Sequence, residues 1–237
     1  MPLAYRCATS CSAVDAPEAL LGRAAAVEEE RRLSLEGRLL GLAQLEQAME
    51  GTVATLSSAM GTRDPYTAGH ERRVAQLAVK IATRLGYADD EVRLLRLAAT
   101  VHDIGKIAVA AEILSKPTRL STAEFAIIKQ HSQAGYDFLE PAGLPREVTD
   151  AVLRHHERLD GSGYPQGPKG DEISAFARIL AVADVVEAMV SYPPYRPALG
   201  VEPALEEIQK GRGERYDPAA CAACPQLFGD EGFAFAD

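Results

Sequence analysis

The 237-residue sequence lacks any long uninterrupted apolar run. No segment reaches the roughly 18 apolar residues that identify a membrane-spanning helix. The N-terminal residues also lack a basic stretch followed by an apolar one, so no signal peptide is predicted. The sequence therefore predicts a cytoplasmic protein that has no membrane as a partner.

Cysteine is scarce as well, with four residues in two loose pairs, Cys7 with Cys11 and Cys221 with Cys224. A zinc site built from both pairs is conceivable, but structural zinc sites usually have tighter ligand spacing than the first pair offers. Reduced thiols without a special role are the favoured interpretation, as expected in a reducing compartment.

Basic residues are in deficit, because 25 Lys and Arg stand against 34 Asp and Glu, giving a net charge of −9. An acidic protein is poorly suited to bind DNA, RNA or an anionic membrane. A small phosphorylated substrate remains compatible, since a metal or a local basic cluster can reverse the field in one cleft. The 47% of hydrophobic residues allow a substantial core, which excludes a disordered or fibrous protein.

The N-terminal part has no sustained pattern over residues 1–27, which are predicted to be a flexible leader. A heptad repeat follows, and its members seven residues apart are Leu35, Leu42, Met49 and Leu56, with Leu39, Val53 and Met60 four residues after the matching members. This repeat predicts a helix over residues 28–61 that acts as a linker or as a coiled coil joining a homodimer. The alternative is a single amphipathic helix packed on the next domain, and glycines at 37, 41 and 51 weaken either helix.

The remaining sequence shows helical periodicity and almost no alternating strand pattern. One apolar face, ended by Gly86 as a C-terminal cap, consists of Val74, Leu77, Ala78, Ile81 and Leu85. Ser121 and Glu124 have the spacing of a capping box. We therefore expect an all-α fold, with one domain over residues 62–220 and a C-terminal tail over residues 221–237.

Seven ionisable side chains interrupt or continue these apolar faces. They are His70, His102, Asp103, His131, His155, His156 and Asp184. A lone buried histidine is usually an ordinary core residue. Burying seven such groups costs several kcal/mol for each charge that is neither paired nor bound to metal. Convergence of all seven on metal ions is the shared explanation.

The spacing of these residues favours a cluster of two metals. Asp103 follows His102 directly, and a carboxylate has two oxygens that can bridge two cations. His155 and His156 would point about 100° apart on a helix, so something between the helices must draw both inward. A ligand set of nitrogen and oxygen without sulfur favours iron or manganese, with zinc less favoured.

Three sequence motifs resemble the HD-GYP family, a bacterial branch of the HD phosphohydrolases. They are D-P-Y-T-A-G-H at 64–70, V-H-D-I-G-K-I at 101–107 and H-H-E-R-L-D-G-S-G-Y-P at 155–165. The similarity extends from about residue 62 to residue 218. It implies a helical bundle, a centre of two or three metals, and a cyclic di-GMP phosphodiesterase that yields pGpG or GMP.

The resemblance also assigns roles to individual residues. The seven ionisable residues named above match the metal ligands of the family, and Asp103 and Lys106 match catalytic positions. Tyr66 stands where some members have a glutamate and hold a third metal, so two divalent metals are expected. Lys106 would neutralise charge on the scissile phosphate. Gly163, Tyr164 and Pro165 would form a wall of the substrate groove.

One segment departs from the family pattern. Members commonly carry Arg-Pro-Tyr-Arg where this chain has Pro193 to Arg196, so the first arginine is replaced by proline. Proline can neither pair with phosphate nor stack on a base, which leaves Arg196 as the expected substrate contact. Lys116 or Arg158 could complete the groove instead.

Other functions remain open at this stage. The substrate could be another cyclic dinucleotide, because the groove and not the metals sets the base preference. A non-catalytic module that senses the nucleotide is a second class, although such modules are expected to lose ligands and none is missing here. A nucleotide-clearing phosphohydrolase of the wider HD class would explain the His-Asp pair but not the Gly-Tyr-Pro run.

Overall fold

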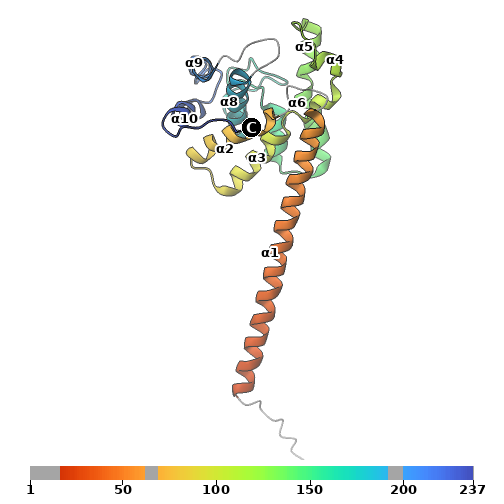
Figure 1. Ribbon diagram of the computed structural model, residues 1–237, viewed down its shortest axis with the longest axis vertical. Helices are drawn as coiled ribbons and strands as arrows, with labels where there is room; N and C mark the ends of the chain where they lie inside the picture. Colours follow the sequence, from red (N-terminus) through yellow and green to blue (C-terminus); the bar gives the residue numbers. More distant parts are fainter. Residues whose placement is uncertain (1–16, 62–68, 192–199, 237) are drawn as a thin grey trace, which may run out of the picture. The chain divides into compact units, whose positions relative to one another are not determined.

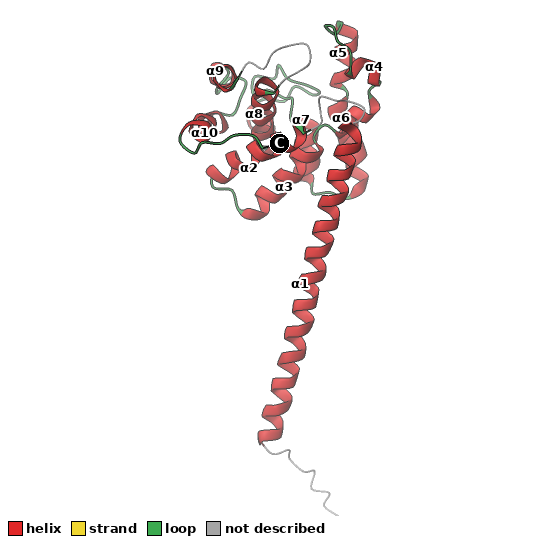
Figure 2. Cartoon of the chain, in the orientation of Figure 1, coloured by secondary structure: helices red, strands yellow, loops and turns green. Residues whose placement is uncertain are grey.

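The computed structural model describes residues 17–61, 69–191 and 200–236, and within these ranges the chain forms helices and no β-strand (Figure 1, Figure 2). The chain divides into two compact units, Met1–Met49 and Glu50–Asp237. The predicted all-α class is confirmed.

The described part of the chain is a succession of helical elements. In chain order they are α1 (Pro17–Gly61), α2 (His70–Arg84), α3 (Asp89–Val101), η1 (Ile104–Ala108), α4 (Ala111–Leu114), α5 (Thr122–Lys129), α6 (His131–Leu139), η2 (Glu140–Ala142), α7 (Arg146–Arg154), η3 (Gly170–Glu172), α8 (Ala175–Val190), α9 (Val201–Lys210) and α10 (Pro218–Gly229).

The first helix, α1, is 45 residues long and begins before the predicted start. Residues 17–27 are therefore helical rather than a flexible leader, because Ala, Leu and Glu are good helix formers and Pro17 suits the first helical position. Residues 1–16 lie outside the described part of the chain. No helix described here combines the length and the apolar character needed to cross a membrane.

Two leucines of the predicted heptad, Leu35 and Leu39, lie on α1 and are each 57% exposed. The glycines at 37, 41 and 51 do not interrupt the helix. The helix is thus longer and more regular than propensity alone suggests. The coiled coil itself remains a prediction.

The core of the second unit forms around α8, which is packed by α2, α7 and α9. A helix surrounded in this way is apolar on most of its circumference, as the sequence of α8 is. The predicted apolar face of α2 is confirmed, since Val74, Leu77, Ala78 and Ile81 are fully buried. Each fully buried Leu or Ile stabilises the fold by about 1.5–3 kcal/mol.

Two predicted helix ends are confirmed in detail. Gly86 follows α2 with φ of 82°, a left-handed conformation that glycine adopts without strain. At the start of α5, Ser121 Oγ accepts the Glu124 N–H at 3.2 Å, and Glu124 accepts the Ser121 N–H at 2.7 Å. The glycine therefore ends α2 after Arg84, and the capping box starts α5 at Thr122.

The C-terminal segment differs from the predicted tail. Residues 218–229 form α10, and its Cys221, Cys224 and Leu227 are fully buried in the core. Apolar residues spaced three and four apart form one apolar face on this helix, and that face packs against the core. Both thiols are free, and burial raises the pKa of each to about 12, so these cysteines behave as core residues. Cys7 and Cys11 lie outside the described residues.

Gly105 sets how closely the His102–Asp103 segment approaches α6. A Cβ on Gly105 would lie 1.9 Å from the carbonyl oxygen of His131 and 2.5 Å from the nitrogen of Gly135. Both atoms belong to the backbone of α6, which cannot yield as a flexible side chain would. Only glycine permits this contact, and the contact brings three of the predicted metal ligands together.

We expect Gly105→Ala to destabilise the protein by about 1–3 kcal/mol, because the added methyl group must push η1 away from α6. Chemical denaturation should report this loss. Gly229→Ala is the matched control, since a Cβ there meets no atom within 4 Å. Equal stability of the two variants would contradict the proposed contact.

Candidate metal centre

Three histidines share one arrangement at helix ends. In His102, His131 and His155 the Nδ1 atom lies 2.7 Å from the carbonyl oxygen three residues earlier. Those carbonyls belong to Ala99, Ile128 and Val152. A carbonyl can only accept a hydrogen bond, so each Nδ1 carries the proton. An imidazole whose single proton is on Nδ1 has a lone pair on Nε2, which is the form that ligates metals.

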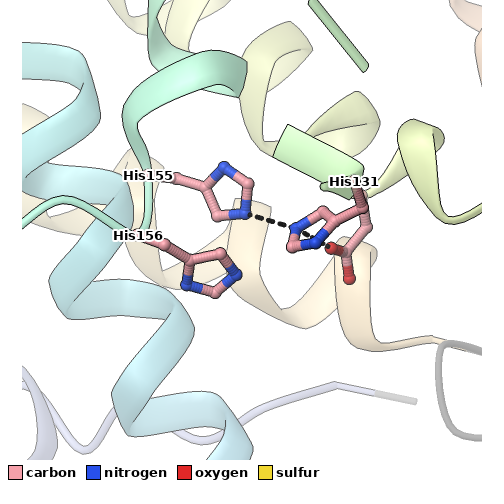
Figure 3. A group of neighbouring side chains, drawn as sticks. His131, His155 and His156 are labelled. Carbon is pink, nitrogen blue, oxygen red and sulfur yellow. Dashed lines mark hydrogen bonds and ion pairs between the residues drawn. The ribbon is translucent and has the colours of Figure 1, made fainter. Parts of the chain in front are cut away.

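Two of these lone pairs face each other. The Nε2 atoms of His131 and His155 are 3.2 Å apart, and both rings are buried (Figure 3). A hydrogen bond between them would require one ring to be protonated. Burial lowers the pKa of both histidines, and for His155 the neighbouring His156 lowers it further, so both rings are neutral. A cation between the two nitrogens would resolve the repulsion of the lone pairs.

The third ring has a similar unmet requirement. His102 is 1% exposed, and its Nε2 has no hydrogen-bond partner among the described residues. An unpaired buried polar atom costs about 1–3 kcal/mol unless a ligand satisfies it. This orphaned nitrogen and the two facing nitrogens are the features of the structure that fit bound metal.

Asp103 lies between two sets of histidines. Its Oδ1 is 3.3 Å from His131 Nε2, whereas its Oδ2 is 3.8 Å from His70 Nε2 and 3.6 Å from His102 Nε2. Each oxygen thus faces a different set, as a bridging carboxylate would. Burial would raise the pKa of this carboxyl, but Lys106 and the histidines outweigh it and hold the pKa well below its usual range.

Asp184, on α8, faces both sets in the same way. Its Oδ1 lies 3.2 Å from His70 Nε2, and its Oδ2 lies 3.7 Å from His156 Nδ1. Burial opposes the ionised form, yet a hydrogen bond from His70 and the charge of His156 keep the pKa of Asp184 below its usual range. Its two oxygens therefore present a second negative charge to both sets.

The seven predicted residues come together as two groups, in each of which the candidate ligand atoms lie within 4.8 Å of one another. One group is Asp103, His131, His155 and His156, and the other is His70, His102 and Asp184. They come from α2, from the end of α3, from α6, from the end of α7 and from α8. The donors are imidazole nitrogen and carboxylate oxygen, so the residues present can hold metal ions.

Lys106 reaches the same place from η1. Its Nζ lies 2.6 Å from Asp103 Oδ2, one turn away along the chain. The ammonium group is thus held at the edge of the carboxylate that faces both histidine sets. A phosphate bound there would meet a positive charge that is already in position.

Glu187 is a residue that the sequence analysis missed. Its buried carboxylate accepts a hydrogen bond from His70 Nδ1 and from Ser191 Oγ, and it accepts the Arg73 Nε–H at 2.6 Å. These contacts fix the His70 ring so that Nε2 faces Asp184. Burial alone would lower the pKa of His70, but its bonds to Asp184 and Glu187 raise the pKa to about 10. The available signal was the spacing of Glu187, one helical turn after Asp184.

Glu157 was missed as well, although it follows the adjacent histidines directly. It is 2% exposed, and its carboxylate accepts the N–H groups of Gln166 at 2.7 Å and Gly167 at 3.1 Å. Gly163 packs on the same residue, because a Cβ there would lie 2.4 Å from Glu157 Cα. The Gly-Tyr-Pro loop is therefore fastened to the segment that carries His155 and His156.

Tyr164 stands beside the metal groups on this loop. Its ring centroid is 4.7 Å from that of His156 and 6.5 Å from that of His131. Burial raises the pKa of its hydroxyl, which therefore stays protonated. Pro165 follows it on the exposed side of the loop. This position suits the predicted wall, whereas the substrate contacts of Gly163, Tyr164 and Pro165 remain predictions.

Other predicted contacts have different outcomes. Tyr66, Pro193 and Arg196 lie outside the described residues. The Lys116 Nζ pairs with Glu124 at 2.6 Å, and its role in the groove remains a prediction. Arg158 is engaged elsewhere, with its guanidinium 5.1 Å from the centre of the Tyr216 ring.

Comparison with known proteins identifies relatives of this chain. The response regulator RpfG of Xanthomonas campestris, a cyclic di-GMP phosphodiesterase, is 39% identical over 193 residues, which cover 80% of this chain and 51% of the relative. The 3'3'-cGAMP-specific phosphodiesterase 3 of Vibrio cholerae is 34% identical over 210 residues, covering 89% and 46%. The chain thus spans about half the length of these curated relatives.

The fold and the family agree with these relatives. The solved structure of Bd1817, a HDG"Y"P protein from Bdellovibrio bacteriovorus, has a TM-score of 0.58 at 18% identity and covers 67% of this chain and 51% of that chain. It shows a shared fold. A family model described as HD domain matches residues 54–220, which include all seven residues of the two groups. The chain belongs to the HD domain family, and within it to the HD-GYP branch.

Proposed function

We propose that this protein is a metal-dependent phosphodiesterase that hydrolyses cyclic di-GMP to pGpG, to GMP, or to both. The observation that carries the proposal is the pair of facing histidine and carboxylate groups joined by Asp103. Buried imidazoles with free lone pairs are costly unless they serve a ligand, and together they form a site for two cations.

The proposed cofactors are two divalent metal ions, with iron or manganese favoured by the nitrogen and oxygen ligands. The ligands would be His70, His102, Asp103, His131, His155, His156 and Asp184. When bound, such ions neutralise charge on a phosphodiester and lower the pKa of a water molecule toward neutrality.

The protein would position the substrate through its own side chains. Lys106, held 2.6 Å from Asp103, would meet the charge that develops on a non-bridging oxygen of the scissile phosphate. Tyr164, next to His156, would close one side of the groove together with Gly163 and Pro165. Arg196 would contact the substrate from the segment after α8. These roles would hold one phosphodiester at the metals and orient it for attack.

The base preference is a separate part of substrate choice, because two relatives are named for different substrates. One is named for cyclic di-GMP and the other for 3'3'-cGAMP. Cyclic di-GMP is the proposed substrate, with another cyclic dinucleotide as the alternative. Rates with both nucleotides, compared as kcat/KM, would decide between them. A sensing role without catalysis would show binding of either nucleotide and turnover of neither.

We also propose that the protein is a homodimer joined through α1 and that it acts in the cytoplasm. The support for a dimer is the heptad repeat, whose Leu35 and Leu39 are each 57% exposed. Apolar side chains in register along a helix are stabilised when a second helix covers them.

Removing the carboxylate that faces both groups should remove metal and activity together. We expect Asp103→Asn to lose at least one of two bound metals and to lower the turnover of cyclic di-GMP more than about 100-fold, because a ligand oxygen and its charge are lost. Metal content and product formation are measured on the same sample. Asp137→Ala, an exposed change on α6, is the control, and a fully active Asp103→Asn protein would refute the proposed centre.

Removing the negative charge of Glu187, which accepts a hydrogen bond from His70 Nδ1, should lower the affinity for metal. We expect Glu187→Gln to lower the affinity for the metal in the group of His70, His102 and Asp184 about 10–100-fold. The His70 ring loses its charged partner, while the shape of the side chain at position 187 is kept. Titration of metal into the metal-free protein gives this affinity without relying on turnover. Glu206→Gln, whose side chain is 71% exposed, is the control, and identical affinities would show that Glu187 does not position His70.

The dimer is tested by changing the heptad positions. We expect the double variant Leu35→Glu and Leu39→Glu to be a monomer in light scattering, because four like charges would meet in the seam. The control is Leu33→Glu with Leu40→Glu, two exposed leucines of the same helix outside the heptad positions. A dimer mass retained by the first variant would exclude the coiled coil.

A further inference from the structure

Lys129 occupies an unusual position at the end of α5. Its Nζ lies 5.0 Å from the centre of the Phe125 ring and 5.1 Å from the centre of the Tyr164 ring. Two aromatic faces attract a cation at these distances. No carboxylate of the described residues lies within ion-pairing distance of this ammonium group, so its positive charge is held in place without being neutralised.

The charge is held next to the metal centre. Tyr164, one of the two rings, has its centroid 4.7 Å from that of His156. His131, two residues after Lys129, belongs to the same metal group. The Tyr164 ring is therefore close both to the ammonium group and to a candidate metal ligand.

The other cations around the centre are already paired. Arg73 Nε lies 2.6 Å from Glu187, Lys106 Nζ lies 2.6 Å from Asp103, and Lys116 Nζ lies 2.6 Å from Glu124. Arg158 lies over the ring of Tyr216 and donates to the carbonyl of Glu157 at 2.9 Å. Lys106 is already assigned to the scissile phosphate, and among the remaining cations Lys129 is the one whose side chain has neither an ion pair nor a hydrogen bond among the described residues.

We propose that Lys129 binds the second phosphate of the cyclic dinucleotide, the one that is not being cleaved. This inference rests on the proposed function. A cyclic dinucleotide carries two phosphodiesters, and the metal groups with Lys106 receive only one of them. The second needs a cation elsewhere, and lysine binds phosphate as a point charge.

The aromatic rings make this lysine suited to the role. Phe125 and Tyr164 both lie close enough to the ammonium group for a cation–π contact, which attracts the cation without neutralising its charge. The rings also restrict the rotamers of a flexible side chain before substrate arrives, which lowers the entropy lost on binding. Pro193 removes one arginine that the family commonly uses, so the groove of this chain has a greater need for another cation.

The test compares Lys129→Gln and Lys129→Arg with the wild-type protein loaded with manganese. The control is Lys210→Gln, which removes the same charge from a side chain that is 70% exposed on α9. The affinity for fluorescently labelled cyclic di-GMP is read by rapid mixing before turnover, at low and high KCl, and KM and kcat are then measured with unlabelled nucleotide. Metal content is determined for every variant.

Loss of one charged contact to phosphate should weaken binding about 10-fold or more in Lys129→Gln. KM should rise with kcat within about 2-fold, and the affinity should depend less on salt than in the wild type. Lys129→Arg should recover most of the affinity, and Lys210→Gln should match the wild type.

Several results would overturn the inference. Equal affinity of Lys129→Gln and Lys210→Gln would show that Lys129 does not bind the nucleotide. A weaker affinity with the wild-type salt dependence would show that Lys129 acts by packing and not through phosphate. If the wild type binds the nucleotide without hydrolysing it, the proposed function fails, while the ratio of affinities still decides the role of Lys129. Absence of binding by the wild type would overturn both.

Discussion

The hydrogen bond between a histidine Nδ1 and the carbonyl three residues earlier is the interaction on which the site depends. It occurs at His102, His131 and His155, and in each case the carbonyl belongs to the last turn of a helix, where carbonyls lack their full set of intrahelical partners. One bond therefore satisfies the helix end and also fixes the tautomer of the ring. The helix ends therefore both carry the candidate ligands and orient each imidazole so that its Nε2 atom points toward the site.

Packing brings these prepared rings together. Gly105 lets η1 approach the backbone of α6, which places Asp103 within 3.3 Å of His131. α8 is apolar around most of its surface and yet carries Asp184 and Glu187 one turn apart. The same helix thus supplies part of the core, a candidate ligand and the carboxylate behind His70.

Much of the site could be predicted from the sequence, because buried ionisable residues interrupt an otherwise apolar helical period. His70 and Asp184 stand out by this criterion, and the structure places both in one group. Glu187 and Glu157 could not be recognised in the same way, since a glutamate near a helix end is ordinary in sequence. The importance of Glu187 comes from His70, a partner 117 residues away along the chain. That of Glu157 comes from the way the following loop folds back onto it.

The ends of the chain show a different limit of sequence reasoning. Residues 17–27 extend α1, and α10 packs in the core through Cys221 and Leu227. Alanine-rich segments with little apolar bulk give weak periodicity, so a helix and an unstructured segment look alike. Tertiary contact decides in α10, where the partner surface is supplied by α2, α8 and α9.

The Glu157 carboxylate accepts the N–H groups of Gln166 and Gly167, and these hydrogen bonds connect the Gly-Tyr-Pro loop to the segment that carries His155 and His156. The loop cannot shift without moving the residue next to His156. Changes of base preference in this branch are therefore constrained, since a loop exchanged between relatives would keep its shape only if the glutamate and the glycine that packs on it were exchanged together. A change in the proposed substrate wall that disturbs Glu157 or Gly163 would therefore also disturb the position of His155 and His156.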